Sequence, residues 1–526
     1  MRKLLIQRAL APALAAVLAV GLALWAPATS PHSNAATFPN DDRAIAHVLN
    51  RIGFGPRPGD VRRVRELGLQ RYVEQQLQPE RIADTAVDAR LAGLTTIRMS
   101  AAQIQTEFEQ PLLEARRRRQ LAAEKSTEPL LAPTQVRANQ LMVELGEQKV
   151  IRAIYGERQL QEVLTDFWFN HFNVDARKGR DRFLLTTYER EAIRPHVLGK
   201  FRDLLEATAK SPAMLFYLDN WMSVDPDAVR PGPGGALRAG NRQKRGLNEN
   251  YGRELMELHT LGVDGGYSQQ DVIEVARAFT GWTIGNPRQG GGYFFNARLH
   301  DAGEKVVLGH RIKAGGGESD GEQVLGILAT HPSTARFIAT KLVRRFVGDI
   351  PPASLVDRAA ARFLDSGGDI REVVRTIVTS PEFLRPDAYR AKVKSPFEFI
   401  VSAVRATGAE VDDATPLVRA LQQLGMPLYA CQPPAGYKDT ADAWVNTGAL
   451  VNRMNLALAL ASNRLRGITV DHADAGDGQQ SPTDDRRFGE LFNGEVSDTT
   501  LATMARATTP AQTLALALGS PEFQKR

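Results

Sequence analysis

The sequence predicts a mostly α fold, a multi-helix globular assembly with one small inserted β-hairpin. Apolar residues recur at helical spacing through most of the 526 residues, which is typical of helices that turn one face to a core. Residues suited to starting a helix, such as Ser268, Asp369 and Thr509, stand before several of these segments. A pattern typical of strands occurs only around residues 293–309.

The first 35 residues are typical of a secretory signal peptide. Basic residues at the start precede an apolar run from Ala9 to Trp25, and small-residue cleavage sites follow it. A retained membrane anchor is the alternative, but the run is short and contains Pro12. We therefore expect an exported protein, periplasmic or extracellular, with no membrane span after signal cleavage.

Charge and cysteine content restrict the possible functions. Removing residues 1–35 takes away three basic residues and no acid, so the net charge falls from +6 to +3. Such a mild charge gives no support to a nucleic-acid partner. Cys431 is the only cysteine, so intramolecular disulfides do not contribute to stability.

The rest of the chain divides into five regions. They are an N-terminal helical region (36–225), a Gly/Pro/Arg-rich loop (226–246), a central helix pair with the hairpin (247–310), a helical region (311–390) and a C-terminal helical region (391–526). The loop is either a cover over a site or an ordinary mobile loop. Asp369 to Phe383 and Thr509 to Phe523 repeat one pattern, a helix start followed by Ser-Pro-Glu-Phe, which we interpret as a structural unit used twice.

The segment from Gly246 to Gly262 places an acid on an apolar helix face. At about 100° per residue, one face of this segment consists of Leu247, Tyr251, Leu255, Leu258 and Leu261. Glu254 lies within that face, and Glu257 borders it. A buried carboxylate is costly unless it is paired, protonated or bound to a metal. His259 lies about 140° away on a regular helix, so we expect it to cap the helix end rather than share an ion with Glu254.

A second helix, from Glu157 to Val174, offers a partner for this acid. His171 lies in the middle of its apolar face. Two interpretations of His171 and Glu254 stay open. They form a hydrogen-bonded structural pair, or separate groups satisfied by backbone and water; or they form a catalytic or metal-binding pair.

The predicted hairpin contributes further candidate ligands. Residues 293–299 and 305–308 flank His300-Asp301-Ala-Gly303, which favours a short turn between two strands. His300 and Asp301 at this turn are either ligands delivered to the helical site or ordinary turn residues. With His171, Glu254 and Glu257 they compose a hypothetical site for a divalent metal ion, for which zinc, manganese and iron are suited.

Several compact catalytic signatures are absent from the sequence. It contains no His-Glu-x-x-His, no P-loop and no Cys-x-x-Cys. A catalytic site must therefore be assembled from residues that lie far apart in the chain.

Several stretches carry a resemblance to a known family. The main ones are Leu49–Pro56, Phe167–Phe172, Asn248–Gly262, Ala278–Trp282 and Tyr429–Tyr437. In these stretches the chain resembles the exported bacterial family known as domain of unknown function 1800. The resemblance implies a signal peptide, a mostly helical fold and a frequent companion, an exported sulfatase-like protein of domain of unknown function 1501. It implies no particular activity.

Two classes of function follow. The first is a metal-assisted or acid–base enzyme of the periplasm, in which Glu254 is the base or ligand and His171 is its partner. The second is a non-catalytic export or assembly partner, in which the same residues stabilise the core.

Overall fold

The computed structural model describes residues 38–122, 132–227, 246–286, 291–472, 492 and 495–526. Phe38–Arg526 forms one compact unit. The predicted signal peptide and nearly all of the 226–246 loop lie outside the described residues. No helix within the described ranges is long and apolar enough to cross a membrane.

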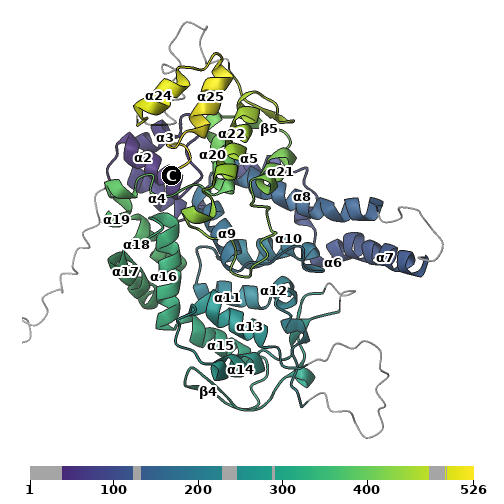
Figure 1. Ribbon diagram of the computed structural model, residues 1–526. Helices are drawn as coiled ribbons and strands as arrows, with labels where there is room; N and C mark the ends of the chain where they lie inside the picture. The colour runs from purple at the N-terminus through teal and green to yellow at the C-terminus, as the bar shows by residue number, and fades with distance from the viewer. Residues whose placement is uncertain (1–37, 123–131, 228–245, 287–290, 473–491, 493–494) are drawn as a thin grey trace, which may run out of the picture. The chain divides into compact units, whose positions relative to one another are not determined.

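Helices dominate the described chain, as predicted (Figure 1). The first group comprises α2 (Asp42–Arg51), α3 (Asp60–Leu67), α4 (Leu69–Gln76), α5 (Thr85–Arg90), α6 (Ala101–Ile104), α7 (Gln110–Ala122), α8 (Ala132–Tyr155), α9 (Gln159–His171), α10 (Leu185–Thr187), α11 (Phe201–Ala209), α12 (Pro212–Tyr217), α13 (Glu249–Glu254) and α14 (Gln269–Ala278). The second comprises α15 (Ser319–Ala329), α16 (Pro332–Phe346), α17 (Ala353–Asp365), α18 (Ile370–Val378), α19 (Pro381–Leu384), α20 (Pro396–Thr407), α21 (Thr415–Gln423), α22 (Thr447–Ala461), α24 (Asp498–Met504) and α25 (Pro510–Gly519). Wider π-helical turns form η3 (Gln105–Glu109), η5 (Tyr188–Ile193) and η8 (Leu255–Thr260).

The predicted helix starts are confirmed by their capping bonds. Ser268 and Asp271 form a reciprocal capping box at the start of α14. The repeated pattern begins both times with a side-chain cap, since Asp369 accepts from the backbone N–H of Glu372 and Thr509 from that of Gln512. Each cap satisfies an N–H group that the first helical turn leaves without a partner.

The strand pairing differs from the prediction, although small hairpins do occur. β1 (Trp282–Ile284) pairs with β2 (Tyr293–Phe295), and β3 (Lys305–Val307) pairs with β4 (His310–Ile312). Residues 293–299 and 305–308 were expected to pair with each other. Instead each strand takes its nearer neighbour in sequence, and the intervening segment is a short helical turn followed by a loop. A third pair joins β5 (Glu410–Val411) to β6 (Ile468–Thr469).

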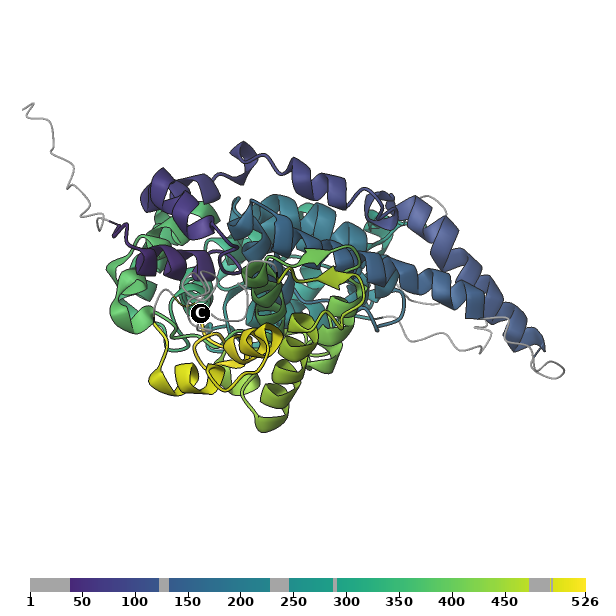
Figure 2. The ribbon, with the colours of Figure 1, turned by 90° about the horizontal axis from the view of Figure 1, so that it is seen from above.

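The main core is a cluster of buried apolar side chains that runs from Ala44 to Phe523, and two smaller clusters lie around Phe108 and Leu91. α16 packs against α17 and α18, α15 packs against α11 and α14, and α22 packs against α25. α7 and α8 lie side by side and extend away from these groups (Figures 1 and 2). The end of α9 lies inside the core, where it contacts η8, α16 and the 427–437 segment.

We expect replacement of Gly321 by alanine to destabilise the fold. A Cβ atom there would lie 2.5 Å from Cζ2 of the buried Trp282, so the indole or α15 must shift, at a cost of about 1–3 kcal/mol. At Gly326, on the same helix, an added Cβ would have no neighbouring atom closer than 4.0 Å. The matched variant Gly326→Ala should therefore be neutral or stabilise by up to about 1 kcal/mol. Urea unfolding of both variants tests the packing, and equal stabilities would contradict it.

Candidate functional site

His171 is the centre of the site, but its partners are not those predicted. Its side chain is buried at the end of α9. Nε2 lies 3.0 Å from the carbonyl oxygen of His259, and Nδ1 lies 2.8 Å from Nζ of Lys341. A carbonyl only accepts, so Nε2 carries the hydrogen and Nδ1 is left to accept from the lysine. Burial, and then the positive charge of Lys341, hold the pKa of His171 well below its ordinary value, so the imidazole is neutral.

Lys341 on α16 is the residue that the sequence did not point to. Among the described residues, Nδ1 of His171 is its only hydrogen-bond acceptor, and no carboxylate forms an ion pair with it. Burial, followed by the charge of Arg344, lowers the pKa of Lys341 to about 8, and Asp439 opposes this shift. The residue is only partly shielded from solvent. Near neutral pH the amine of Lys341 therefore exists in both its charged and its neutral form, and its hydrogen-bond partner is the neutral imidazole of His171.

The π-helical turn η8 brings His259, rather than Glu254, to the side of the helix that contacts His171. Thr260 Oγ1 donates to the carbonyl of Leu255, and the N–H of Leu261 reaches back to Met256, which is wider than a regular α-turn. The extra residue rotates everything after Leu255, and His259 becomes buried. The regular 100° spacing therefore misplaces the residues after Leu255, whereas Glu254 precedes the wide turn.

Glu254 itself lies at the border of the core. It is half-buried, and no described residue forms a hydrogen bond or ion pair with its carboxylate. Burial raises its pKa, and the neighbouring charge of Glu257 adds to the effect. Glu257 accepts a bond of 3.3 Å from the hydroxyl of Tyr267.

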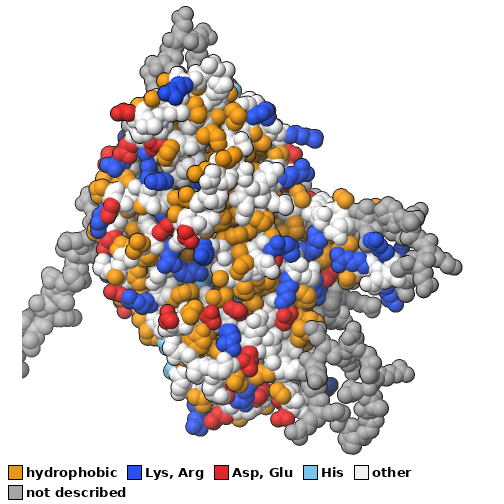
Figure 3. All heavy atoms as spheres, in the orientation of Figure 1, with side chains coloured by type: hydrophobic (Ala, Val, Ile, Leu, Met, Phe, Trp, Pro, Cys, Tyr) orange, Lys and Arg blue, Asp and Glu red, His pale blue; other side chains and the backbone are white. Residues whose placement is uncertain are grey.

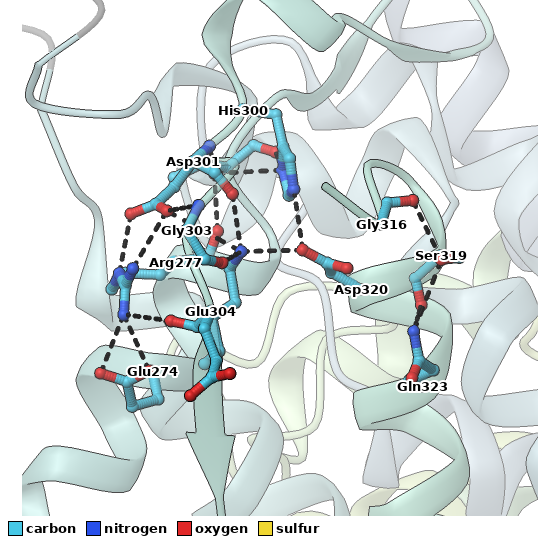
Figure 4. A network of polar contacts seen from close by, with 12 residues as sticks. Glu274, Arg277, His300, Asp301, Gly303, Glu304, Gly316, Ser319, Asp320 and Gln323 are labelled. Carbon is cyan, nitrogen blue, oxygen red and sulfur yellow. Dashed lines mark hydrogen bonds and ion pairs between the residues drawn. The ribbon is translucent and has the colours of Figure 1, made fainter. Parts of the chain in front are cut away.

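His300 and Asp301 belong to a network of polar contacts centred on Asp320 and Arg277 (Figure 4). His300 Nε2 lies 3.1 Å from Asp320 Oδ2, and Lys305 Nζ lies 2.7 Å from the same oxygen. Asp301 binds Arg277 through both carboxylate oxygens, at 2.7 and 3.1 Å. Lys305 and Asp320 are fully buried. Two cations from the protein thus occupy the positions that a metal ion would take beside these carboxylates.

The predicted metal ligands are consequently divided among three places. His171 contacts Lys341, Glu254 and Glu257 lie on α13 and η8, and the hairpin residues bind Arg277, Lys305 and Asp320. Across the described ranges no three His, Cys, Asp or Glu side chains are arranged to hold a metal ion. The described geometry offers no metal site of the composition expected.

The end of α9 joins segments that are far apart in the sequence. Asn170 exchanges two hydrogen bonds with the backbone of Tyr437, at 2.8 and 2.7 Å. Asn173 donates to the carbonyls of Cys431 and Pro433, at 2.9 and 3.0 Å. Three stretches singled out in the sequence, at 167–172, 248–262 and 429–437, therefore meet at one place. Asn170 lies inside the first of them and Asn173 directly follows it, whereas no periodicity or motif marks Lys341.

Comparison with known proteins gives a family but no activity. Residues 47–525 match a family model described as "Protein of unknown function (DUF1800)". No curated protein and no solved structure matches the chain.

We expect Glu254→Gln to stabilise the protein slightly at pH 7, by less than about 1 kcal/mol. A raised pKa means that the folded state holds the proton more tightly, so ionised Glu254 weakens folding above its unfolded pKa. The gain of the variant should vanish as the pH falls to about 4. Urea unfolding at pH 7 and at pH 4 measures the difference in stability between the wild-type chain and the variant. Glu66→Gln, at an exposed position, is the control. A loss of about 1.5–3 kcal/mol at pH 7 would instead reveal a partner for the carboxylate.

Asp320→Asn should be strongly destabilising. It removes the carboxylate that neutralises the buried Lys305 ammonium group, and breaking one side of a buried pair costs about 3–5 kcal/mol. Asp357→Asn breaks the exposed pair with Arg336 and should cost less than about 1 kcal/mol. Thermal and urea unfolding compare the two, and similar losses would contradict a buried structural role.

Proposed function

The chain belongs to the DUF1800 family of proteins of unknown function, and on that premise we propose that Lys341 is the reactive amine of a catalytic centre. The proposed reaction class is addition to a carbonyl compound, an aldehyde or a ketone. His171 holds the amine in place. The observation that carries the proposal is that the only described acceptor for this amine is a neutral imidazole, 2.8 Å away.

The environment of the amine suits nucleophilic chemistry. With a pKa of about 8, roughly a tenth of Lys341 is neutral at pH 7, against less than about a thousandth of an ordinary lysine. Catalytic lysines are activated in this way, by partial desolvation or a neighbouring cation. Arg344 supplies the cation, and the α9–η8 contact supplies the burial.

The proposed steps use only the amine and its imidazole partner. One N–H of neutral Lys341 donates to Nδ1 of His171, which leaves the nitrogen lone pair free. The lone pair attacks the carbonyl carbon, and a C–N bond forms as the C–O π bond breaks. The oxygen takes the proton that the attacking nitrogen gives up, which yields a carbinolamine. Its C–O bond then breaks, the hydroxyl group leaves as water with the second nitrogen proton, and an imine remains. Because Nε2–H of His171 is held by the carbonyl of His259, the ring keeps Nδ1 turned towards the amine throughout.

The site of action is also part of the proposal. The signal-like N-terminus supports export, which would place this chemistry outside the cytoplasm. Lys341 replaces Glu254 as the proposed reactive group, because Glu254 contacts no described partner suited to acid–base work.

One observation favours a second, non-catalytic function. Asn170, His171 and Asn173 all bind backbone groups of distant segments, as residues do that hold a fold together. In this alternative the chain is an export or assembly partner, for which the sulfatase-like companion implied by the family resemblance is the candidate.

Reductive trapping separates the two functions. Full-length protein treated with formaldehyde and cyanoborohydride should be methylated at Lys341 about ten times faster than free Nα-acetyllysine amide at pH 7, because far more of its amine is neutral. The rate at Lys341 should reach half its maximum near pH 8, as the pKa requires. Peptide mass mapping over pH 6–10 measures both quantities.

Lys341→Arg is the matched variant, since it keeps a donor to His171 and removes the nucleophile. It should fold normally and lose the fast phase of labelling. A rate at Lys341 no greater than that of the free amine at pH 7 would favour the assembly function.

A further inference from the structure

A cavity far from Lys341 in the sequence lies between α2, the segment before α20 and the chain end. Its volume is about 60 Å³, and concave sites are where small ligands usually bind. The C-terminal end of the chain lies beside α2 in both ribbon views (Figures 1 and 2). The cavity walls thus come from both ends of the described chain, and one of them is the Leu49–Pro56 stretch noted in the sequence.

Basic side chains dominate the lining. The cations are Arg43, Arg57, Arg390, Lys394, Lys525 and Arg526, whereas the acids are Glu495 and Glu522. Both acids are already engaged. Glu495 binds Arg43 at 2.9 Å, and Glu522 accepts from the backbone of Ser497 and the hydroxyl of Thr500. Arg57 is paired with Asp60 and Glu157 outside the lining, but the other basic side chains still outnumber the two acids.

Lys394 is the most unusual residue of this cavity. It is 3 % exposed, and no described oxygen accepts a hydrogen bond from its Nζ. That nitrogen lies 3.6 Å from the ring centre of Phe523, which is its closest favourable contact. An ammonium group at this position is costly without an acceptor, so the chain by itself favours the neutral amine, whose donors are available to a ligand.

Arg526 presents a second set of unused donors. It is also 3 % exposed. Its Nε lies 2.8 Å from Glu398, and Nη2 donates to the carbonyl of Arg345, but Nη1 is buried without a partner. Glu398 is shared with Arg345, which also has buried donors without partners. One carboxylate is thus surrounded by more positive charge than it can neutralise.

We propose that this cavity binds an anion, whose carboxylate or phosphate group accepts hydrogen bonds from Nζ of Lys394 and Nη1 of Arg526. Both residues are buried and line the cavity; Nη1 of Arg526 is a buried donor without a partner, and no described oxygen accepts a hydrogen bond from Nζ of Lys394. Bonds to an anion from charged donors are about twice as strong as neutral ones. Over the face shown in Figure 3, basic, acidic and apolar side chains are interspersed, so the unbalanced charge is a property of the cavity rather than of that surface.

Ligand binding should be accompanied by proton uptake. Within the chain alone, burial holds the pKa of Lys394 well below its ordinary value. Arg390, Arg453 and Arg526 lower it further, and only Glu398 opposes them. His47, the titratable group that α2 contributes, is neutral because burial lowers its pKa to about 3. A bound anion raises the pKa of Lys394, because its negative charge favours the ammonium form. Lys394 then takes up a proton from solution.

Calorimetry on the full chain tests the proposal. Inorganic phosphate and succinate are titrated at constant ionic strength, each in two buffers of different ionisation enthalpy at pH 7.5. We expect saturable binding of at least one probe, with a heat that depends on the buffer because a proton is taken up. The relative affinities of the two probes identify the ligand as phosphate-like or carboxylate-like.

Lys394→Met is the decisive variant, with Lys438→Met as its matched control on the surface. Methionine fills similar space and removes a buried charge, so the fold should hold; Lys394→Gln is the second variant if it does not. Affinity should fall about 10- to 100-fold for the Lys394 variants, and the buffer dependence should disappear. Lys438, whose side chain is 75 % exposed, should change affinity less than about twofold. Absence of binding by the wild-type chain, or equal affinity in Lys394→Met, would overturn the proposal.

Discussion

The organisation of the candidate site depends on the carbonyl group of His259. It lies at the end of η8, where the helix leaves its last carbonyls without backbone donors. His171 supplies the missing donor at 3.0 Å, and this single bond has two consequences. It ties α9 to η8 across the core, and it decides which ring nitrogen carries the hydrogen. The other nitrogen must then face Lys341 as an acceptor.

The chain treats buried charge in two different ways. Around Lys305 the ammonium group has two carbonyls and the Asp320 carboxylate within 2.9 Å, so its donors are fully used. Lys341 has one neutral acceptor, and Lys394 has none among the described residues. A closed network stabilises the fold and leaves nothing for a ligand. An incomplete network weakens the fold and leaves hydrogen-bond donors or a nitrogen lone pair available to a ligand. We therefore assign the two proposed functions to Lys341 and Lys394.

The two open sites differ in chemistry and in their partners, although α16 carries both Lys341 and Arg345, whose carbonyl accepts a hydrogen bond from Arg526. Lys341 is hydrogen-bonded to His171 at the end of α9, whereas Lys394 lies in the cavity where the two ends of the described chain meet. Neither depends on the other for its partners, since Lys341 contacts His171 and Lys394 contacts Phe523. An anion bound at Lys394 is therefore not required for the imine chemistry proposed at Lys341.

The sequence by itself determined the helical class, the capped starts of α14, α18 and α25, and the burial of His171. These features depend on neighbours within one or two turns, which spacing records. Only the tertiary structure decided the partners. The π-turn of η8 widens the helix after Leu255, so a regular 100° rotation misplaced the residues that follow, His259 among them. The strands paired locally rather than across His300, and Lys341 came to His171 from 170 residues away. Contacts of that separation are set by packing of whole elements, and no local pattern encodes them.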